Sequence, residues 1–357
     1  MLHPPNSISA ARISRLLIIR PGGIGDAVLL LPALAALKRL VPDAEVHVLA
    51  ERRNRAVFTL SPHVDSVFCY DSPDGLHKVY KSTYDAVIDT EQWYRLSAVV
   101  ARLTRAPIVA GFGTNERRRM FNVAIDYSQH THEATSFGML FRAVFPGLPD
   151  VLPRDGIRIP KKAVDTATAV LAPMEGMRGK VALFPGSSIP EKKWPVECWQ
   201  SLAHNLARVG YEIAVIGGSD VLKAAGIILK GLPGVNAAGT LTLSETAALL
   251  SRVQLLVSGD SGVLHLAWLL GTPTISLFGP SDEVKWAPRG DRHIVINKKL
   301  ECSPCTTFGT TPRCLYGARC MIEISVDEVF NAACMLLTQE GVMPSLCCKR
   351  DWIERAL

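Results

Sequence analysis

The chain has 357 residues, enough for two domains of ordinary size, each with its own core. Hydrophobic residues make up 48% and charged residues 20%, a globular composition that excludes a disordered chain. The formal charge of +6 suits anionic ligands or a lipid-headgroup surface, but it is too small to require a nucleic acid. RNA-binding aromatic motifs and zinc-finger spacings are also missing from the sequence, so we expect no nucleic-acid partner.

The start of the chain lacks the apolar core of a signal peptide. The first apolar run, RLLIIRPGGIGDAVLLLPALAAL, is interrupted by Arg20, three glycines and Asp26, so it is not expected to span a bilayer. We therefore expect a cytoplasmic protein whose cysteines are reduced.

Short apolar runs alternate with helical stretches along the whole chain. In the first part, strands are predicted at 15–20, 45–50, 66–70, 86–90 and 108–112, and a helix is predicted from about residue 25 to about residue 40. In the second part, strands are predicted at 181–186, 212–218, 255–260 and 274–280, with helices near 196–209 and at 326–338. Continuous apolar runs separated by helices indicate buried parallel strands.

Two successive βα series of similar length predict an α/β protein with two doubly wound, Rossmann-like halves that face each other across a cleft. We place the first domain at 1–160 and the second at 161–325. The connection is predicted within 145–162, a stretch rich in proline, glycine and charge. A last helix, 326–357, is a candidate to pack back on the first domain.

A glycine-rich turn with one carboxylate, RPGGIGDAVLLLPAL, follows the first predicted strand. It fits a dinucleotide-binding fingerprint poorly, because Val28 stands where a third glycine would allow close helix packing. Glu51, after the second strand, nevertheless leaves a nicotinamide-binding protein open. Asp26 has two compatible interpretations: it caps the helix, or it faces the cleft and accepts a proton from a hydroxyl group.

The turn after the strand at 181–186 carries polar side chains suited to a phosphate. Its sequence, PGSSIPEKKWP, supplies the hydroxyl groups of Ser187 and Ser188 and the ammonium of Lys192, a point charge that binds phosphate. Taken alone, Lys192 and Lys193 would be interpreted as a solvated surface pair. The phosphate interpretation therefore depends on the neighbouring turns.

Two further turns of the second half also end predicted strands. IGGSD ends in Asp220, and GDSGVLH opens a helix whose first N–H groups form an anion site. There Asp260 is placed to bind sugar hydroxyls and His265 to donate to a phosphate, although His265 alone is equally well interpreted as a core histidine. Because open α/β sheets bind ligands at the carboxyl ends of their strands, the three turns together predict a nucleotide-diphosphate pocket without a Walker motif.

These segments occur together in one known family. The combination of RPGGIGDAVLLLPALAAL, AGFGTNERRRMFNVAIDY, FPGSSIPEKKWP, VSGDSGVLHLAWLLGTPTISLFGPSD and a late cysteine segment resembles glycosyltransferase family 9, the ADP-heptose:lipopolysaccharide heptosyltransferases. The matching pieces run nearly end to end. The resemblance implies the two-domain GT-B architecture and the transfer of heptose from ADP-heptose to the lipopolysaccharide inner core.

The resemblance also implies residue roles. In that family the aspartate matching Asp26 is the general base, and the basic residue matching Arg20 lies beside the reacting groups. The implied reaction is an inverting displacement that requires no catalytic metal or other cofactor. Family members can carry a glutamate that holds the adenosine ribose where this chain offers only Asp220, which leaves the nucleotide base open. The donor-binding residues implied are Ser187, Ser188, Lys192, Asp220, Asp260, Ser261, Gly262 and His265.

Three consecutive arginines, Arg117, Arg118 and Arg119, follow the AGFG turn. They fit a solvated surface and an acceptor-binding site equally well. An anionic lipopolysaccharide core or lipid A-type acceptor matches guanidinium groups, and it would bring the protein into peripheral contact with the inner membrane. The other basic stretch, RHIVINKK at 292–299, is predicted to be a solvated face.

Four of the nine cysteines, Cys302, Cys305, Cys314 and Cys320, fall within 19 residues. A pair of cysteines separated by two residues can bind zinc, and iron–thiolate binding is the other metal option. The resemblance adds that some protein-modifying relatives have an iron-binding cysteine segment. Because the second pair is spaced irregularly, a reduced structural loop is favoured over structural zinc or iron.

The sequence leaves three functions open besides a nicotinamide-dependent dehydrogenase. The first is an ADP-heptose-dependent transferase that builds the lipopolysaccharide core. The second keeps the fold and chemistry but uses a protein acceptor or another nucleotide-sugar donor. The third is a non-catalytic sugar-nucleotide binding protein, and the presence of Asp26, Lys192, Asp260 and His265 counts against it.

Overall fold

A computed structural model describes residues 13–174 and 178–339. The chain folds into two compact units, and the boundary after Pro160 lies within the predicted connection. Two short segments that the sequence places in the second domain join unit 1 instead, because their side chains contact it: Lys285 pairs with Glu133, and Phe308 stacks on Trp93. Of the described residues, unit 1 comprises 13–160, Val284–Trp286 and Thr306–Thr310, and unit 2 comprises 161–174, 178–283, Ala287–Cys305 and 311–339.

Unit 1 is built around a six-stranded parallel sheet with the strand order β3-β2-β1-β4-β5-β6. Five strands coincide closely with the predicted ones, whereas β6 is a half-buried edge strand of three residues that the sequence does not reveal. The strands are β1 (Arg15–Arg20), β2 (Glu45–Ala50), β3 (Ser66–Cys69), β4 (Ala86–Asp89), β5 (Ile108–Phe112) and β6 (Val123–Ile125). The helices are α1 (Ile24–Leu40), α2 (Arg55–Thr59), α3 (Pro73–Lys81), α4 (Leu96–Leu103), the 3-10 helix η2 (Glu116–Met120) and α5 (Glu133–Val144).

Helices cover both faces of this sheet. Leu17 and Ile19 of β1 pack with Val79 of α3 and Val100 of α4. Successive side chains of a strand point to opposite faces, so the intervening residues of β1 turn to the other face. There α1 packs against α5. Because both faces are covered, the strands are continuous apolar runs, which is why the sequence reveals them.

Unit 2 is built around a second six-stranded parallel sheet, with the order β12-β11-β10-β7-β8-β9. The basic stretch at 292–299, predicted to be a solvated face, contains the half-buried edge strand β12 instead. The strands are β7 (Lys180–Phe184), β8 (Glu212–Val215), β9 (Gly234–Asn236), β10 (Leu255–Gly259), β11 (Thr274–Phe278) and β12 (His293–Asn297). The helices are α6 (Lys161–Leu171), η3 (Pro190–Lys192), α7 (Val196–Arg208), η4 (Ser219–Val221), α8 (Leu222–Ile228), α9 (Leu243–Leu250), α10 (Gly262–Leu270), α12 (Arg319–Ile322) and α13 (Val326–Gln339). The short helix α11 (Glu283–Trp286) begins at the last residue of a unit 2 segment, and its other three residues belong to unit 1.

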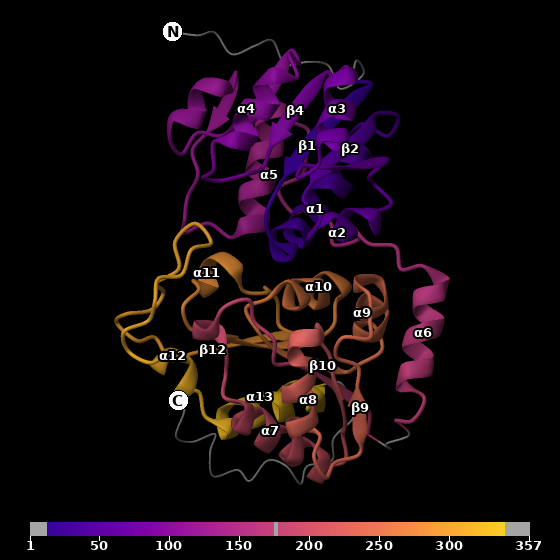
Figure 1. Ribbon diagram of the computed structural model, residues 1–357, viewed down its shortest axis with the longest axis vertical. Helices are drawn as coiled ribbons and strands as arrows, with labels where there is room; N and C mark the ends of the chain where they lie inside the picture. Colours follow the sequence, from indigo (N-terminus) through magenta and orange to yellow (C-terminus); the bar gives the residue numbers. More distant parts are fainter. Residues whose placement is uncertain (1–12, 175–177, 340–357) are drawn as a thin grey trace. The chain divides into compact units, whose positions relative to one another are not determined.

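Helix α13 packs on unit 2, where it lies next to α7 (Figure 1). Its side chains Val329, Ala333 and Leu337 belong to the buried core formed with α7, α8 and the sheet. The expectation that the last helix packs on the first domain is therefore wrong for Val326–Gln339, and residues 340–357 lie outside the described part of the chain. The amphipathic sequence pattern of α13 indicates that one face of this helix is buried, but it does not indicate which domain that face packs against.

The two sheets have the same topology. In each sheet the chain reverses its direction of winding between the first strand and the fourth, β1 and β4 in unit 1 and β7 and β10 in unit 2. The prediction of two doubly wound α/β units is thus confirmed. Loops that leave the two strands at such a switch point diverge, and ligands of open α/β sheets bind between them. Functional residues are therefore expected after β1, β4, β7 and β10.

Within residues 13–174 and 178–339, no helix combines the length and the apolar character that crossing a membrane requires.

Candidate functional site

The loop between β1 and α1 places Asp26 in the first turn of the helix. Gly22 has a φ of 109°, which residues with a side chain rarely adopt, and a Cβ atom at Gly23 would lie 3.1 Å from Asp26 Oδ2. Gly23 is the N-cap residue, and no side chain caps α1. The interpretation of Asp26 as a helix cap is therefore wrong. The missing side chain of Gly23 leaves space beside the Asp26 carboxylate.

The Asp26 carboxylate is held through one of its two oxygens. Arg20 Nη2 lies 3.5 Å from Oδ1, and Gln92 Nε2 donates to the same oxygen at 3.3 Å. Oδ2 has no partner among the described residues, and the Asp26 side chain is 21% exposed. An accessible carboxylate oxygen without a hydrogen bond can accept a proton from a bound hydroxyl group.

Arg20, at the end of β1, is buried among acidic groups. Its Nη1 donates to the Thr90 carbonyl at 2.7 Å, and its Nη2 lies 3.7 Å from Glu91 Oε2. Burial opposes the positive charge, but Asp26, Glu91 and Glu133 outweigh it and raise the pKa of Arg20. The structure thus brings the two predicted catalytic residues together, with a permanent cation beside Asp26.

Four further side chains complete this network, and none of them is predicted from the sequence. Gln92, after β4, donates to Asp26 and to Glu133, the first residue of α5. Glu133 also accepts a hydrogen bond from Tyr127 at 2.8 Å and pairs with Lys285 at 2.8 Å. The position of Gln92 at a strand end could have marked it, but nothing in the sequence marks Glu133 or Lys285.

In unit 2, three predicted donor-binding residues meet at the switch point. Lys192 Nζ lies 2.6 Å from Asp260 Oδ2, and His265 Nε2 lies 3.7 Å from Asp260 Oδ1. Ser281 Oγ also donates to Asp260 Oδ2, at 2.6 Å. Burial opposes ionisation of Asp260, but Lys192 and His265 outweigh it and hold the pKa of this carboxyl well below its usual range. The site therefore combines an ionised carboxylate with a lysine ammonium.

The start of α10 lies next to this carboxylate. Ser261 is the N-cap residue, and its Oγ accepts a hydrogen bond from the Leu264 amide at 3.2 Å. Gly262 is the first residue of the helix. The amides of a first helical turn have no carbonyl partner within the helix, and the helix dipole adds positive charge there. Lys192 and the start of α10 thus offer two kinds of donor to an anion.

The other predicted donor-binding residues follow β7 and β8. The Ser187 hydroxyl is engaged in its own turn, where it donates to the Ile189 carbonyl at 3.0 Å and accepts from the Ile189 amide at 3.3 Å. Ser188 is exposed, and so is Asp220 in η4. Ser188 and Asp220 are therefore accessible to a ligand.

The three arginines predicted to bind an acceptor have different environments. Arg117 lies in η2 and is fully buried, and its Nη2 lies 2.6 Å from the equally buried Asp89. The prediction that Arg117 binds an acceptor is therefore wrong, because η2 packs against α4 and turns this side chain toward β4. Arg118 is exposed and pairs with Asp126 at 2.8 Å, and Arg119 is exposed.

The four clustered cysteines lie in the described part of unit 2. Burial and the nearby thiols of Cys302, Cys305 and Cys314 raise the pKa of Cys320 to about 11. The amides of Tyr316 and Ala318 donate to Cys314 Sγ at 3.4 and 3.3 Å. Across the described ranges, no group of three or more histidine, cysteine, aspartate or glutamate side chains is arranged to hold a metal ion. Structural zinc or iron at these cysteines stays a prediction.

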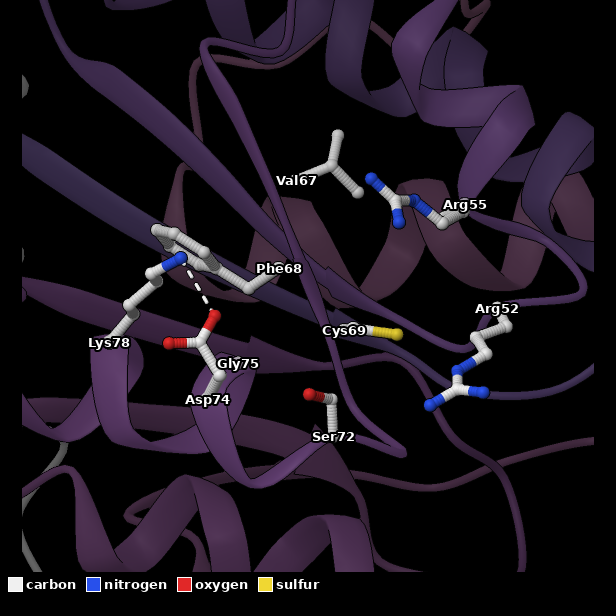
Figure 2. Close-up of a pocket in the computed structure, with 9 residues that line it drawn as sticks. All are labelled: Arg52, Arg55, Val67, Phe68, Cys69, Ser72, Asp74, Gly75 and Lys78. Atoms are coloured by element: carbon white, nitrogen blue, oxygen red, sulfur yellow. Dashed lines mark ion pairs between the residues drawn. The ribbon is translucent and has the colours of Figure 1, made fainter.

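A pocket of about 290 Å³ lies at the β3 edge of the unit 1 sheet (Figure 2). Three of its lining side chains are cationic, and the sequence analysis did not single them out: Arg52 and Arg55 follow β2, and Lys78 belongs to α3. Lys78 pairs with Asp74 at 2.7 Å, the acidic side chain that lines the pocket. The lining therefore carries a net positive charge and suits an anionic ligand.

Comparisons with known proteins cover most of the chain. The sequence profile of glycosyltransferase family 9 (heptosyltransferase) matches residues 76–315. The chain is 24% identical over 315 residues to lipopolysaccharide heptosyltransferase 1 of Pseudomonas aeruginosa, covering 82% of this chain and 86% of that protein. It is 22% identical over 354 residues to lipopolysaccharide heptosyltransferase 2 of Salmonella typhimurium, covering 92% and 100%. The solved structure of E. coli ADP-heptose lps heptosyltransferase II matches with a TM-score of 0.75 at 22% identity, covering 92% of this chain and 99% of that one, which confirms the GT-B class of fold.

The buried and exposed arginines of η2 allow a direct test of the corrected assignment. We expect Arg117→Met to lower the free energy of unfolding by about 3–5 kcal/mol, because it leaves the Asp89 carboxylate buried without its cation. The matched control Arg118→Met removes an exposed ion pair and should change the free energy of unfolding by about 1 kcal/mol or less. Urea unfolding at neutral pH measures both, and equal stability losses would contradict the structural role of Arg117.

Proposed function

The chain belongs to glycosyltransferase family 9 and is a glycosyltransferase, and on this premise we propose that it transfers heptose from ADP-heptose to the lipopolysaccharide inner core. The observation that carries the proposal is the accessible carboxylate of Asp26 beside Arg20 at the switch point of unit 1. The similarity to lipopolysaccharide heptosyltransferases supports this choice of donor and acceptor. Because this acceptor is attached to a lipid, we also propose a cytoplasmic location with peripheral contact to the inner membrane.

Unit 2 binds the donor in this proposal. Lys192 Nζ has three N–H donors, and among the described residues only Asp260 accepts from it, so two remain for phosphate oxygens. The first amides of α10, at Ser261 and Gly262, add donors to the same diphosphate. Asp260 stays ionised and accepts hydrogen bonds from sugar hydroxyls, while His265 donates to a phosphate.

Three residues at neighbouring strand ends complete the proposed donor site. Ser188 offers an exposed hydroxyl, and Ser187 keeps its turn in place through the contacts with Ile189. Asp220 follows β8 and is exposed, as a group that binds ribose hydroxyls must be.

Unit 1 supplies the base in this proposal. Asp26 accepts the proton of the acceptor hydroxyl while the acceptor oxygen forms a bond to the anomeric carbon of heptose. The bond from that carbon to the diphosphate breaks, and its electron pair leaves with ADP. A single displacement of this kind inverts the anomeric configuration. Lys192 and the α10 amides stabilise the growing negative charge, and one such preorganised donor is usually worth about 3 kcal/mol. Protein donors fill this role, so the proposed mechanism includes no catalytic metal.

The cationic pocket of unit 1 is the proposed binding site for an anionic group of the acceptor (Figure 2). Arg55 forms no ion pair among the described residues, and the carboxylate paired with Arg52, that of Asp71, is 3.9 Å away. Guanidinium groups without a close carboxylate can bind phosphate or carboxylate through paired hydrogen bonds. The exposed Arg118 and Arg119 remain further candidates, whereas the buried Arg117 is excluded.

The proposed base is tested by Asp26→Asn, which removes the proton-accepting oxygen but keeps the size of the side chain. We expect turnover to fall about a hundredfold or more, while calorimetry still shows wild-type affinity for ADP, which binds unit 2. A coupled assay of ADP release measures turnover. The control Asp43→Asn changes an exposed aspartate elsewhere in unit 1 and should remain fully active. Wild-type turnover of Asp26→Asn would remove this residue from the mechanism.

The proposed acceptor pocket is tested by Arg55→Ala. We expect the KM for purified lipopolysaccharide acceptor to rise about tenfold or more, because a hydrogen bond to a charged group is lost, while the KM for ADP-heptose is unchanged. The control Arg53→Ala removes a neighbouring arginine that does not line the pocket and pairs with Glu51 at 2.6 Å. An acceptor KM that responds equally to both substitutions would rule out a specific site in this pocket.

A further inference from the structure

We infer that Gln92 is a positioning residue that fixes the orientation of the Asp26 carboxylate, so that Oδ2 is the atom that receives the proton. The inference rests on the proposed function, because it takes Asp26 as the base. Gln92 follows β4, and Asp26 follows β1, so the two side chains approach each other from the two strands that form the switch point of unit 1.

The Gln92 amide is fixed in one orientation by three contacts. Its Nε2 donates to Asp26 Oδ1 at 3.3 Å and to Glu133 Oε1, and its Oε1 accepts from Arg20 Nη2 at 3.5 Å. A side-chain amide has two N–H donors and one carbonyl oxygen, and each faces a partner of the matching kind. A flipped amide would direct its carbonyl oxygen at two carboxylates and its N–H groups at a guanidinium. The side chain is 8% exposed, so water offers little compensation for such a flip.

Glu133 anchors this amide and is itself fully engaged. Its Oε1 accepts from Gln92, while its Oε2 accepts from the Tyr127 hydroxyl and pairs with Lys285 Nζ, both at 2.8 Å. Burial and the Glu133 charge raise the pKa of Tyr127, so this hydroxyl keeps its proton and donates. Glu133 is 0% exposed. It therefore cannot receive a proton from an acceptor in solution and serves as an anchor, not as a second base.

The cation that pairs with Glu133 is equally constrained. Lys285 Nζ donates to the backbone carbonyls of Ser128 and Thr131, each at 3.1 Å, in addition to its ion pair with Glu133. Three partners match the three N–H donors of an ammonium group. The chain of contacts from Lys285 through Glu133 to Gln92 therefore ends on Asp26 with little freedom along the way.

Both polar contacts to the Asp26 carboxylate are made to the same oxygen, Oδ1, and the proposed role of Gln92 rests on this asymmetry. Arg20 and Gln92 both approach Oδ1, whereas Oδ2 lies near Gly23 and has no partner in the described ranges. Rotation of a carboxylate about its last bond has broad minima, so the carboxylate depends on hydrogen bonds for a defined orientation. Without the Gln92 donor, the 3.5 Å contact with Arg20 would be the one polar contact left to this carboxylate within the described ranges. The proton-accepting oxygen would then be less well placed, which lowers turnover and leaves donor binding in unit 2 unchanged.

A double-mutant cycle on the full-length protein tests this inference. Gln92→Met keeps the length of the side chain but removes its donors. We expect it to lower kcat for heptose transfer about tenfold or more, with the KM for ADP-heptose unchanged. In the Asp26→Asn background the same substitution should have no further effect, because Gln92 acts through that carboxylate. The control Gln200→Met makes the same change on α7, where the Gln200 side chain donates to the Ile227 carbonyl and has no other partner among the described residues, and should remain fully active.

Each outcome of the cycle has a defined meaning. A wild-type kcat for Gln92→Met, or an equal fold loss in both backgrounds, would overturn the positioning role. Full activity of Asp26→Asn would overturn the proposed base instead, so failure of the inference and failure of the proposed function are distinguishable. Thermal unfolding of each variant shows whether a loss of kcat reflects loss of the folded state.

Gln92→Glu gives a second readout if Gln92→Met does not fold. This variant keeps the shape of the side chain and places another carboxylate beside Asp26, so the acid limb of the pH–rate profile should move to higher pH. An unmoved acid limb would overturn the inference. The charged and titratable groups that face this position are Arg20, Asp26, Glu91, Tyr127, Glu133 and Lys285.

Discussion

Each unit holds an aspartate against a cation at the point where its strand order reverses. Asp26 lies beside Arg20 in unit 1, and Asp260 pairs with Lys192 in unit 2. A carboxylate removed from water needs such a partner, because an isolated buried charge costs several kcal/mol. Because the two sheets have the same strand order, each has a switch point. The loops diverge there and leave room for polar groups and for a ligand.

The surroundings of the two carboxylates indicate different roles. Both oxygens of Asp260 are engaged, Oδ1 by His265 and Oδ2 by Lys192 and Ser281, and the carboxyl stays ionised. Such a group accepts hydrogen bonds and positions a ligand. Asp26 is engaged through Oδ1 alone and is partly exposed, which leaves a basic oxygen accessible. Our proposal therefore gives the same residue type a binding role in unit 2 and the role of the base in unit 1.

The interior strands could be predicted because helices cover both sheet faces, which makes runs such as RLLIIR continuously apolar. The edge strand β3 is predicted as well, whereas the edge strands β6, β9 and β12 are short or half-buried and are not. The run of three arginines has no periodicity that separates Arg117 from its neighbours, since its burial depends on Asp89, far away in the sequence. Asp26 and Lys192 lie in recognisable strand-end motifs, whereas Glu133 and Lys285 become neighbours only through the tertiary fold.

The most direct test of the view that the switch point of unit 2 binds the donor is the affinity for ADP measured by calorimetry. The Kd of Lys192→Met should rise about tenfold or more, because a charged hydrogen bond to phosphate is lost. The adjacent exposed residue provides a matched control, and Lys193→Met should bind ADP as the wild type does. A wild-type Kd for Lys192→Met would contradict this assignment of the donor site.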